Sequence, residues 1–397
     1  MKLYPNLVRA VVGALDQIFR ERKYADKVIQ KTLKLDKRWG ARDRKFIAET
    51  TYEIVRWYRW IYELRGAPPS SKEDWWEMIG IWLLWQNITL PDWKEFNSLS
   101  PSTITTRASD LQSNRAIRAS IPEWLDEMAS TELQEQWSPT LSALNRTAPL
   151  VIRTNTLKTT RSKLQKSLQL QDISSKKYSE DALIISKRTN LFSLDAFKKG
   201  LFEIQDGGSQ QIAPFLEVQP GMQVIDACAG AGGKTLHLAA LMKNKGRILA
   251  LDIYKWKLKE LRRRATRAGC DLIETRLISN QKVIKRLKGK ADRLLLDVPC
   301  SGLGVLKRNP DAKWKLNPVY LERVKATQQQ ILETYPVMLK KGGLFVYATC
   351  SILPSENQEQ VEKFLKLKEG QFTLIKEQQL LPQEGFDGFY MALIRKE

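Results

Sequence analysis

The sequence predicts an α/β protein in which a parallel sheet, covered by helices on both faces, follows a helical region and a small α+β piece. From about Gly207 onward, strand-like and helix-like segments alternate, which is the pattern of such a sheet. A glycine-rich turn follows the first of these strands. Residues 1–140 instead carry apolar residues at helical spacing.

Length and cysteine usage limit the class of protein. A chain of 397 residues is too long for one core of ordinary size, so we expect two or three domains. Four cysteines are too few to stabilise a chain of this length through disulfide bonds, and the start MKLYPNLVRAVVGAL lacks a secretory pattern. We therefore expect free thiols, a cytoplasmic location and, by default, a monomer. The longest apolar run, MIGIWLLW, is far shorter than the roughly 20 residues of a membrane helix, so no membrane partner is expected.

The net charge indicates the class of binding partner. Lys and Arg total 65 against 44 for Asp and Glu, a formal charge of +21, which favours a polyanion, and nucleic acid before a membrane surface. A solvated basic surface that aids solubility is the alternative. A single histidine and the absence of a C-x-x-C pair argue against Ser-His-Asp catalysis and against a metal site.

In residues 1–140, helical spacing of apolar residues covers 7–19, 44–64 and 74–86, with a break at the prolines 68 and 69. Six tryptophans fall on these helices at spacings typical of core packing, although base stacking is the alternative: Trp57, Trp60, Trp75, Trp76, Trp82 and Trp85. The basic stretch 31–46 is the better candidate for contact with nucleic acid, and a solvated loop is the alternative.

Residues 145–206 combine short strand-like runs with one helical pattern and predict a small α+β piece. Beyond it, residues 207–397 form the alternating region. We expect strands at 222–226, 246–253, 291–300 and 342–351, with helices at 234–244, 254–269 and 318–340. Ligands of such sheets bind beyond the carboxyl ends of the strands, where the motifs of this region lie.

The turn DACAGAGGKT, residues 226–235, fails both the P-loop and the dinucleotide patterns by one residue. A small-residue turn also lets the backbone approach an adenosine ligand without a phosphate. Asp252, which ends the next strand, is then placed to accept hydrogen bonds from two ribose hydroxyls. This arrangement is typical of an S-adenosylmethionine site. Asp252 as a plain helix cap and a nicotinamide-dependent dehydrogenase are the alternatives.

Two cysteines, Cys300 and Cys350, stand at the ends of two predicted strands, and Asp297 precedes the first. Methylation at cytosine C5 needs a thiolate that adds to C6, an acid near N3 and a methyl donor, but no histidine and no metal. These residues and the adenosine site supply those parts. The alternatives are buried filler, the interpretation given to Cys228 and Cys270, and a redox disulfide between Cys300 and Cys350.

The motifs DACAGAGGKTLHLA, LLLDVPCSGLGVLKRNPDAKW and YATCSILPSENQEQV resemble those of the Sun/RsmB-type RNA cytosine-5 methyltransferases. RTNTLK and DGFYMALIRK resemble the family's upstream motif and closing hairpin. The resemblance implies a Rossmann-like S-adenosylmethionine-dependent core with a small α+β subdomain, preceded by an all-α NusB-like RNA-binding domain. Small-subunit ribosomal RNA is the implied substrate. Transfer RNA, or a role as a non-catalytic ribosome assembly factor, remains an alternative.

The resemblance also assigns roles to residues. It implies that Cys350 adds to C6, that Cys300 helps to eliminate the enzyme from the product, and that Asp297 lies between the donor methyl group and the base. The implied cofactor residues are Cys228, Ala229, Gly230, Ala231, Gly232, Gly233, Lys234, Asp252 and Asp297. The turn departs from the family pattern by losing a proline, and the acidic residue expected after the third strand is absent. Ser279 or Asn280 is the expected substitute.

Overall fold

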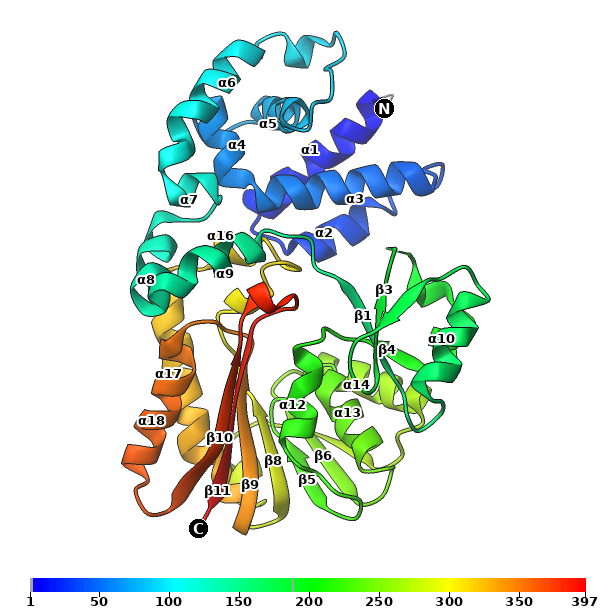
Figure 1. Ribbon diagram of the computed structural model, residues 1–397, viewed down its shortest axis with the longest axis vertical. Helices are drawn as coiled ribbons and strands as arrows, with labels where there is room; N and C mark the ends of the chain where they lie inside the picture. The colour runs from blue at the N-terminus through cyan, green and yellow to red at the C-terminus, as the bar shows by residue number, and fades with distance from the viewer. Residues whose placement is uncertain (1–2, 188) are drawn as a thin grey trace. The chain divides into compact units, whose positions relative to one another are not determined.

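The computed structural model describes residues 3–187 and 189–397, which divide into two compact units (Figure 1). The helical unit consists of the residues up to Arg146 together with Leu306–Pro318. The sheet unit consists of Thr147–Val305 and Val319–Glu397. Residues 1, 2 and 188, which fall within predicted regions, lie outside the described residues. Among the helices of the described ranges, none has both the length and the apolar composition needed to cross a bilayer.

The helical unit has a core built from the apolar faces of its first five helices. Its α-helices are α1 (Pro5–Phe19), α2 (Ala25–Thr32), α3 (Ala41–Arg56), α4 (Tyr58–Arg65), α5 (Lys72–Trp85), α6 (Pro101–Asp110), α7 (Arg115–Arg118), α8 (Glu123–Leu133), α9 (Trp137–Leu144) and α16 (Ala312–Lys315). Trp60, Trp75 and Trp76 are buried in this core, and Trp57 and Trp82 pack against it. Packing is therefore confirmed for these tryptophans, whereas Trp85 is exposed.

One segment of the helical unit comes from far along the chain. Residues 306–318 follow the Cys300 motif, yet the Lys313 Nζ donates to Arg56 O at 2.8 Å and the Trp314 Nε1 donates to Val55 O at 2.7 Å. Both acceptors belong to the end of α3. No periodicity in the sequence signals this association, and the segment falls within the predicted region 207–397.

The small α+β piece of the sheet unit is a four-stranded antiparallel sheet in the order β2-β3-β1-β4. Its elements are β1 (Leu150–Thr154), α10 (Arg161–Gln169), β2 (Ser175–Lys177), β3 (Ala182–Ile185), α11 (Asp195–Lys198) and β4 (Phe202–Ile204). Leu164 and Leu168 of α10 are buried against the sheet with Ile152 and Phe202.

The larger sheet has seven strands in the order β10-β11-β9-β8-β5-β6-β7. The strands are β5 (Gln223–Asp226), β6 (Arg247–Asp252), β7 (Ile273–Leu277), β8 (Ala291–Asp297), β9 (Leu339–Thr349), β10 (Phe372–Leu380) and β11 (Phe389–Lys396). The α-helices around it are α12 (Ser209–Phe215), α13 (Gly233–Leu241), α14 (Lys255–Ala268), α15 (Gln281–Lys285), α17 (Pro318–Thr334) and α18 (Gln358–Leu367).

Side chains alternate between the two faces of this sheet, as expected for strands buried on both sides. Leu295 of β8 packs with α12, α13 and α14, whereas its neighbours Leu294 and Leu296 pack with α17 and α18. The α/β fold class is thereby confirmed. The parallel arrangement predicted for the alternating strands holds for β9, β8, β5, β6 and β7. At the other edge β11 pairs antiparallel with both β9 and β10, where the resemblance of the closing motif implied a hairpin.

The candidate site lies at the carboxyl edge of the parallel strands. Asp226, Asp252, Asp297 and Thr349 are the last residues of β5, β6, β8 and β9. These four strands are neighbours in the sheet and point the same way, so their ends share one edge. The predicted motifs all begin where these strands end.

Candidate active site and cofactor cavity

The turn between β5 and α13 depends on glycine. Gly230 and Gly232 have φ values of +54° and +89°, the left-handed region that other residues rarely adopt. A Cβ on Gly232 would lie 2.6 Å from the Leu261 Cγ of α14. The glycines therefore allow a tight turn that also packs closely on the next helix.

Asp252 ties this turn to the end of β6. Its carboxylate is buried, accepts the Gly230 N–H at 2.8 Å through one oxygen, and accepts the Tyr254 N–H at 2.8 Å through the other. The second bond orders the chain just before α14. Asp252 therefore has the helix-capping role that was the alternative to ribose binding. Each carboxylate oxygen has further acceptor capacity, so both roles are compatible.

A cavity of about 750 Å³ opens beside these residues, within the size range of small-molecule sites. Of the predicted cofactor residues, Cys228, Gly230, Asp252 and Asp297 line it. Asn280 also lines it and Ser279 does not, although the Asn280 Oδ1 already accepts the Lys282 N–H at 2.9 Å. The mostly apolar walls and the carboxylates of Asp252 and Asp297 suit an adenosine ligand that carries a positive sulfonium.

Other residues of the cavity wall were not predicted. Tyr254 and Lys257 belong to α14 or directly precede it, and Thr327, Gln330 and Tyr335 come from α17 and the turn after it. Burial raises the pKa of Tyr335 to about 12, so its hydroxyl stays protonated and can donate. The sequence predicted a helix at 318–340, but no motif marked its polar residues as part of a site.

The remaining residues of the predicted turn lie away from the cavity lining. Ala229 is buried, and its N–H donates to Leu251 O at 2.9 Å. Ala231 and Gly233 present their carbonyl groups to arginines on the far side of the turn. The turn therefore has a cavity face and a supporting face.

Lys234 faces Asp297. Its Nζ lies 2.6 Å from the Asp297 Oδ2, and it also stands 5.5 Å from the centre of the Phe389 ring. Burial acts to lower the pKa of Lys234, but Asp297, Cys350 and Asp226 together raise it by more, so the net shift is upward and the side chain stays protonated. Asp297 thus has a fixed cationic partner at the cavity edge.

The two cysteines at the strand ends meet. The Cys300 and Cys350 sulfurs lie 3.2 Å apart as free thiols, and the Cys350 N–H points to the Cys300 sulfur at 3.3 Å. The hydrogen bond with Cys350, together with burial, raises the pKa of Cys300 well above its usual value. Cys300 therefore keeps its proton and can donate it to the Cys350 sulfur.

The other two cysteines are unsuited to nucleophilic chemistry. Burial raises the pKa of Cys228 well above its ordinary value and raises that of Cys270 to about 12. Within residues 3–187 and 189–397, no group of three or more His, Cys, Asp and Glu side chains is arranged to hold a metal ion.

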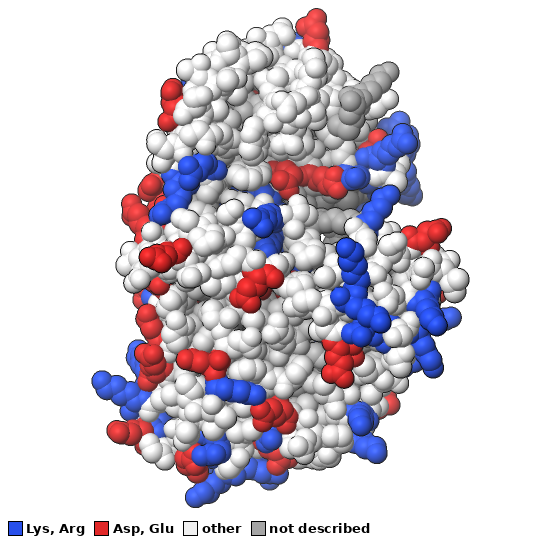
Figure 2. Space-filling model, in the orientation of Figure 1, with Lys and Arg blue, Asp and Glu red and all other residues white. Residues whose placement is uncertain are grey.

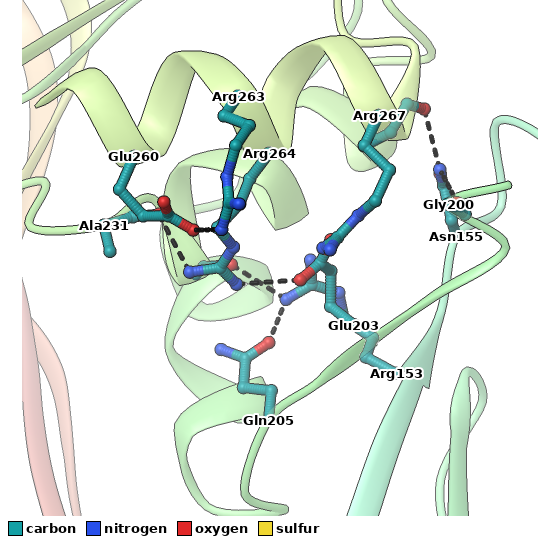
Figure 3. A network of polar contacts seen from close by, with 12 residues as sticks. Arg153, Asn155, Gly200, Glu203, Gln205, Ala231, Glu260, Arg263, Arg264 and Arg267 are labelled. Atoms are coloured by element: carbon teal, nitrogen blue, oxygen red, sulfur yellow. Dashed lines mark hydrogen bonds and ion pairs between the residues drawn. The ribbon is translucent and has the colours of Figure 1, made fainter. Parts of the chain in front are cut away.

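A network of arginines supports the turn from behind (Figure 3). Arg153 of the small sheet is buried, and its guanidinium donates to Gly233 O at 2.9 Å and to the Gln205 side chain. Arg264 of α14 donates to Ala231 O at 2.8 Å and to Glu203 at 2.8 Å. Burial lowers the pKa of Arg153 to about 10, which still leaves it charged at neutral pH.

We expect Arg264→Met to weaken S-adenosylhomocysteine binding by about tenfold, or about 1.4 kcal/mol, because a charge-assisted hydrogen bond to the turn is lost. Arg263→Met is the matched control, since Arg263 is the preceding residue but is exposed and pairs only with Glu260 at 2.7 Å. Calorimetric titration measures both. Equal affinities for the two variants would contradict a supporting role for the network.

Asp226, at the end of β5, is a buried acid that accepts the Thr235 hydroxyl at 2.7 Å. Burial raises its pKa from 3.8 to about 7. The folded chain therefore holds a proton that the unfolded chain releases, and the corresponding stability is complete below about pH 4 and lost as the pH rises to 7. Asp226→Asn keeps an acceptor for Thr235 and removes this loss.

We expect the gain in unfolding free energy of Asp226→Asn over the wild type to grow from pH 5 to pH 8 by about 2 to 3 kcal/mol. Urea unfolding at the two pH values measures it. Asp195→Asn, at an exposed position, serves as the control. A gain that does not change with pH would show that Asp226 is already ionised at pH 5.

Comparison with known families agrees with the site formed by the two cysteines, the glycine turn and the cavity. Residues 213–395 match the family model described as 16S rRNA methyltransferase RsmB/F, and residues 121–191 match the ferredoxin-like domain of RsmF/B-like methyltransferases. These matches cover the two sulfurs, the turn and the cavity.

Curated relatives carry corresponding names. The chain is 31% identical over 306 residues to the ribosomal RNA small subunit methyltransferase B of Pseudomonas syringae pv. tomato, covering 72% of this chain and 68% of the relative. It is 35% identical over 252 residues to a probable ribosomal RNA small subunit methyltransferase B of Synechocystis, covering 62% of this chain but only 56% of that one. The crystal structure of PH0851 matches the whole fold with a TM-score of 0.85 at 23% identity, covering 100% of both chains.

Proposed function

Because the chain belongs to the RsmB/F family of 16S rRNA methyltransferases, we propose that it transfers a methyl group from S-adenosylmethionine to carbon 5 of a cytosine in small-subunit ribosomal RNA. The observation that carries the cytosine-5 chemistry is the pair of free thiols 3.2 Å apart, beside a cavity that ends at Asp297. A methyltransferase acting on a nitrogen or oxygen atom needs no thiol pair.

In this proposal Cys350 is the nucleophile. Its thiolate adds to cytosine C6, which breaks the aromatic system and makes C5 an enamine carbon able to attack a methyl group. The protonated Cys300 can donate a hydrogen bond to the Cys350 sulfur, which lies 3.2 Å away. Asp297, held by Lys234, would lie beside the base at the cavity edge, where its carboxylate would accept a hydrogen bond from the 4-amino group or from N3 once N3 carries a proton.

The later steps return the enzyme to its starting state. Once C5 carries the methyl group, a base takes the C5 proton, the electron pair re-forms the C5–C6 double bond, and the Cys350 sulfur leaves. Cys300 assists this elimination. The proton balance closes because Cys350 departs as a thiolate.

The cavity residues would hold the methyl donor. S-adenosylmethionine supplies an electrophilic methyl group at its sulfonium centre. Asp252 would accept the two ribose hydroxyls, the backbone around Gly230 would lie against the nucleoside, and Asn280 would contact adenine in place of the acidic residue of the family pattern.

RNA would be held by basic surfaces of both units. Helix α14 exposes Lys255, Lys259, Arg262 and Arg263, and Figure 2 shows positively charged side chains on the side of the sheet unit where α10 lies. The helical unit would serve as the NusB-like RNA-binding domain, with an unstacked or extruded cytosine as the target. The proposal places the protein in the cytoplasm, as a monomer.

Bisulfite sequencing of RNA from cells with and without the protein tests this function. We expect one cytosine of small-subunit ribosomal RNA to lose its bisulfite resistance when the protein is absent. Loss at a transfer RNA position would correct the substrate. No change in any RNA, combined with no incorporation of labelled methyl groups by the purified protein, would favour a non-catalytic assembly factor.

A further inference from the structure

Glu356 lies between the two cysteine loops. It ends the 3₁₀ helix at Pro354–Glu356, six residues after Cys350, and its side chain is fully buried, with 0% exposed. The carboxylate accepts four hydrogen bonds, from two hydroxyls, one backbone N–H and one side-chain amide. The Glu356 oxygens are the acceptors in all four bonds.

Three of these four bonds come from the residues that directly follow the cysteines. Ser301, next to Cys300, donates its N–H to the Glu356 Oε1 at 2.8 Å and its hydroxyl to the Oε2. Ser351, next to Cys350, donates its hydroxyl to the same Oε2. The two serine oxygens are 3.2 Å apart, so a single carboxylate oxygen holds both loops at one point.

The fourth bond extends the arrangement to α17. The Gln328 Nε2 donates to the Glu356 Oε1 at 2.9 Å and to Pro299 O at 3.0 Å, which holds the chain just before Cys300. The Tyr347 hydroxyl donates to Glu356 O at 2.6 Å and fixes the backbone of the glutamate itself. Four of these residues are almost completely buried: Gln328, Tyr347, Ser351 and Glu356.

The spacing of the sulfurs requires such a link. Cys300 and Cys350 belong to separate loops after β8 and β9, and the sheet fixes those loops only as far as Asp297 and Thr349. A misplacement of about 1 Å between reacting groups is enough to cost a large part of the rate. A shared buried anchor one residue beyond each cysteine removes this freedom.

We propose that Glu356 is a positioning residue that sets the distance between the Cys300 and Cys350 sulfurs through Ser301 and Ser351. The geometric part stands on the hydrogen bonds alone, whereas the consequence for methyl transfer rests on the proposed function. Glu356 touches neither the base nor the methyl donor, so its removal changes the placement of the thiols and leaves cofactor binding intact.

Thiol pairing measures the geometry without any RNA. Diamide takes two electrons and two protons from a pair of thiols, forms their disulfide and becomes the hydrazine. We expect the wild type to form the Cys300–Cys350 disulfide readily, because the sulfurs already lie 3.2 Å apart. Glu356→Gln turns an acceptor into a donor facing other donors, and should slow this disulfide about tenfold, as measured by mass spectrometry of the linked peptides.

Glu359→Gln is the matched control, because Glu359 lies three residues away on an exposed face of α18. We expect it to pair its thiols at the wild-type rate. Glu356→Asp, which keeps the acceptor on a shorter side chain, should recover part of the rate. If Glu356→Gln does not fold, Ser351→Ala takes its place, since it removes one hydroxyl donor from the same carboxylate. Wild-type pairing in whichever variant folds would overturn the proposal.

Turnover supplies the second readout. We expect Glu356→Gln to lower kcat for methyl transfer by 10- to 100-fold, with the RNA KM and the S-adenosylhomocysteine affinity within about twofold of the wild type. If the wild type transfers no methyl group, the proposed function fails while the pairing result still decides the role of Glu356. Slow pairing together with unchanged kcat would overturn the catalytic part of the proposal.

Discussion

Replacing Cys350 with alanine is expected to abolish methyl transfer, with a loss of at least about 10⁴-fold in the single-turnover rate. Without a sulfur to add to C6, C5 of cytosine stays an aromatic carbon, and neither positioning nor Asp297 can make it nucleophilic. Cys350 does not line the cofactor cavity, so S-adenosylhomocysteine should bind within about twofold of the wild type. Transfer of labelled methyl groups and calorimetric titration measure the two effects.

Cys270→Ala is the control for this experiment. Cys270 is a buried thiol whose pKa burial raises to about 12, and it packs in the hydrophobic core. We expect the control to lose some stability, as truncation in a core does, and to keep its turnover. Substantial turnover in Cys350→Ala, with none in Cys300→Ala, would reverse the roles assigned to the two cysteines.

Sequence patterns predict the centre of the sheet well and its edge poorly. The runs around Leu294 and Phe345 are continuously apolar because both faces of β8 and β9 are covered, and such runs are visible without a structure. β10 is mostly exposed and has a register irregularity between Leu374 and Lys376, so its pattern is weak. Only the resemblance of the closing motif to a family hairpin indicated strands there.

The segment 306–318 shows a second reason why part of the fold cannot be predicted from the sequence. It contains Lys307, Asp311 and Lys313, residue types that are mostly found on surfaces, yet all three are buried. Burial is possible because specific partners in the helical unit satisfy them, such as Arg56 O for Lys313 and Ala25 N for Asp311. Partners so distant along the chain leave no local signature.

Some features of the candidate site can be predicted from the sequence, and others cannot. Strand ends place Cys300, Cys350, Asp252 and Asp297 at one edge, because a parallel sheet aligns its carboxyl ends. The direction of a side chain is harder to predict, and the sequence did not show that Lys234, expected among the cofactor residues, pairs with Asp297. Glu356 was missed because a glutamate in a loop is usually solvated, and only the three-dimensional structure brings both serines to it.

Replacing Cys300 with alanine is expected to trap the enzyme on its substrate. Cys350 can still add to C6 and the methyl group can still be transferred, but elimination lacks the group that assists it. A covalent protein–RNA adduct should therefore accumulate, stable to denaturing electrophoresis and close to one per enzyme, while multiple turnover falls by about 100-fold or more. Labelled cofactor shows whether the trapped RNA already carries the methyl group.

The double variant Cys300→Ala, Cys350→Ala separates the two roles, because it should form no adduct at all. The first step in Cys300→Ala should also be slower than in the wild type, since the alanine cannot donate to the sulfur that lies 3.2 Å from Cys300. Normal release of methylated RNA by Cys300→Ala would show that elimination does not need Cys300, and its role would then be limited to the hydrogen bond with Cys350.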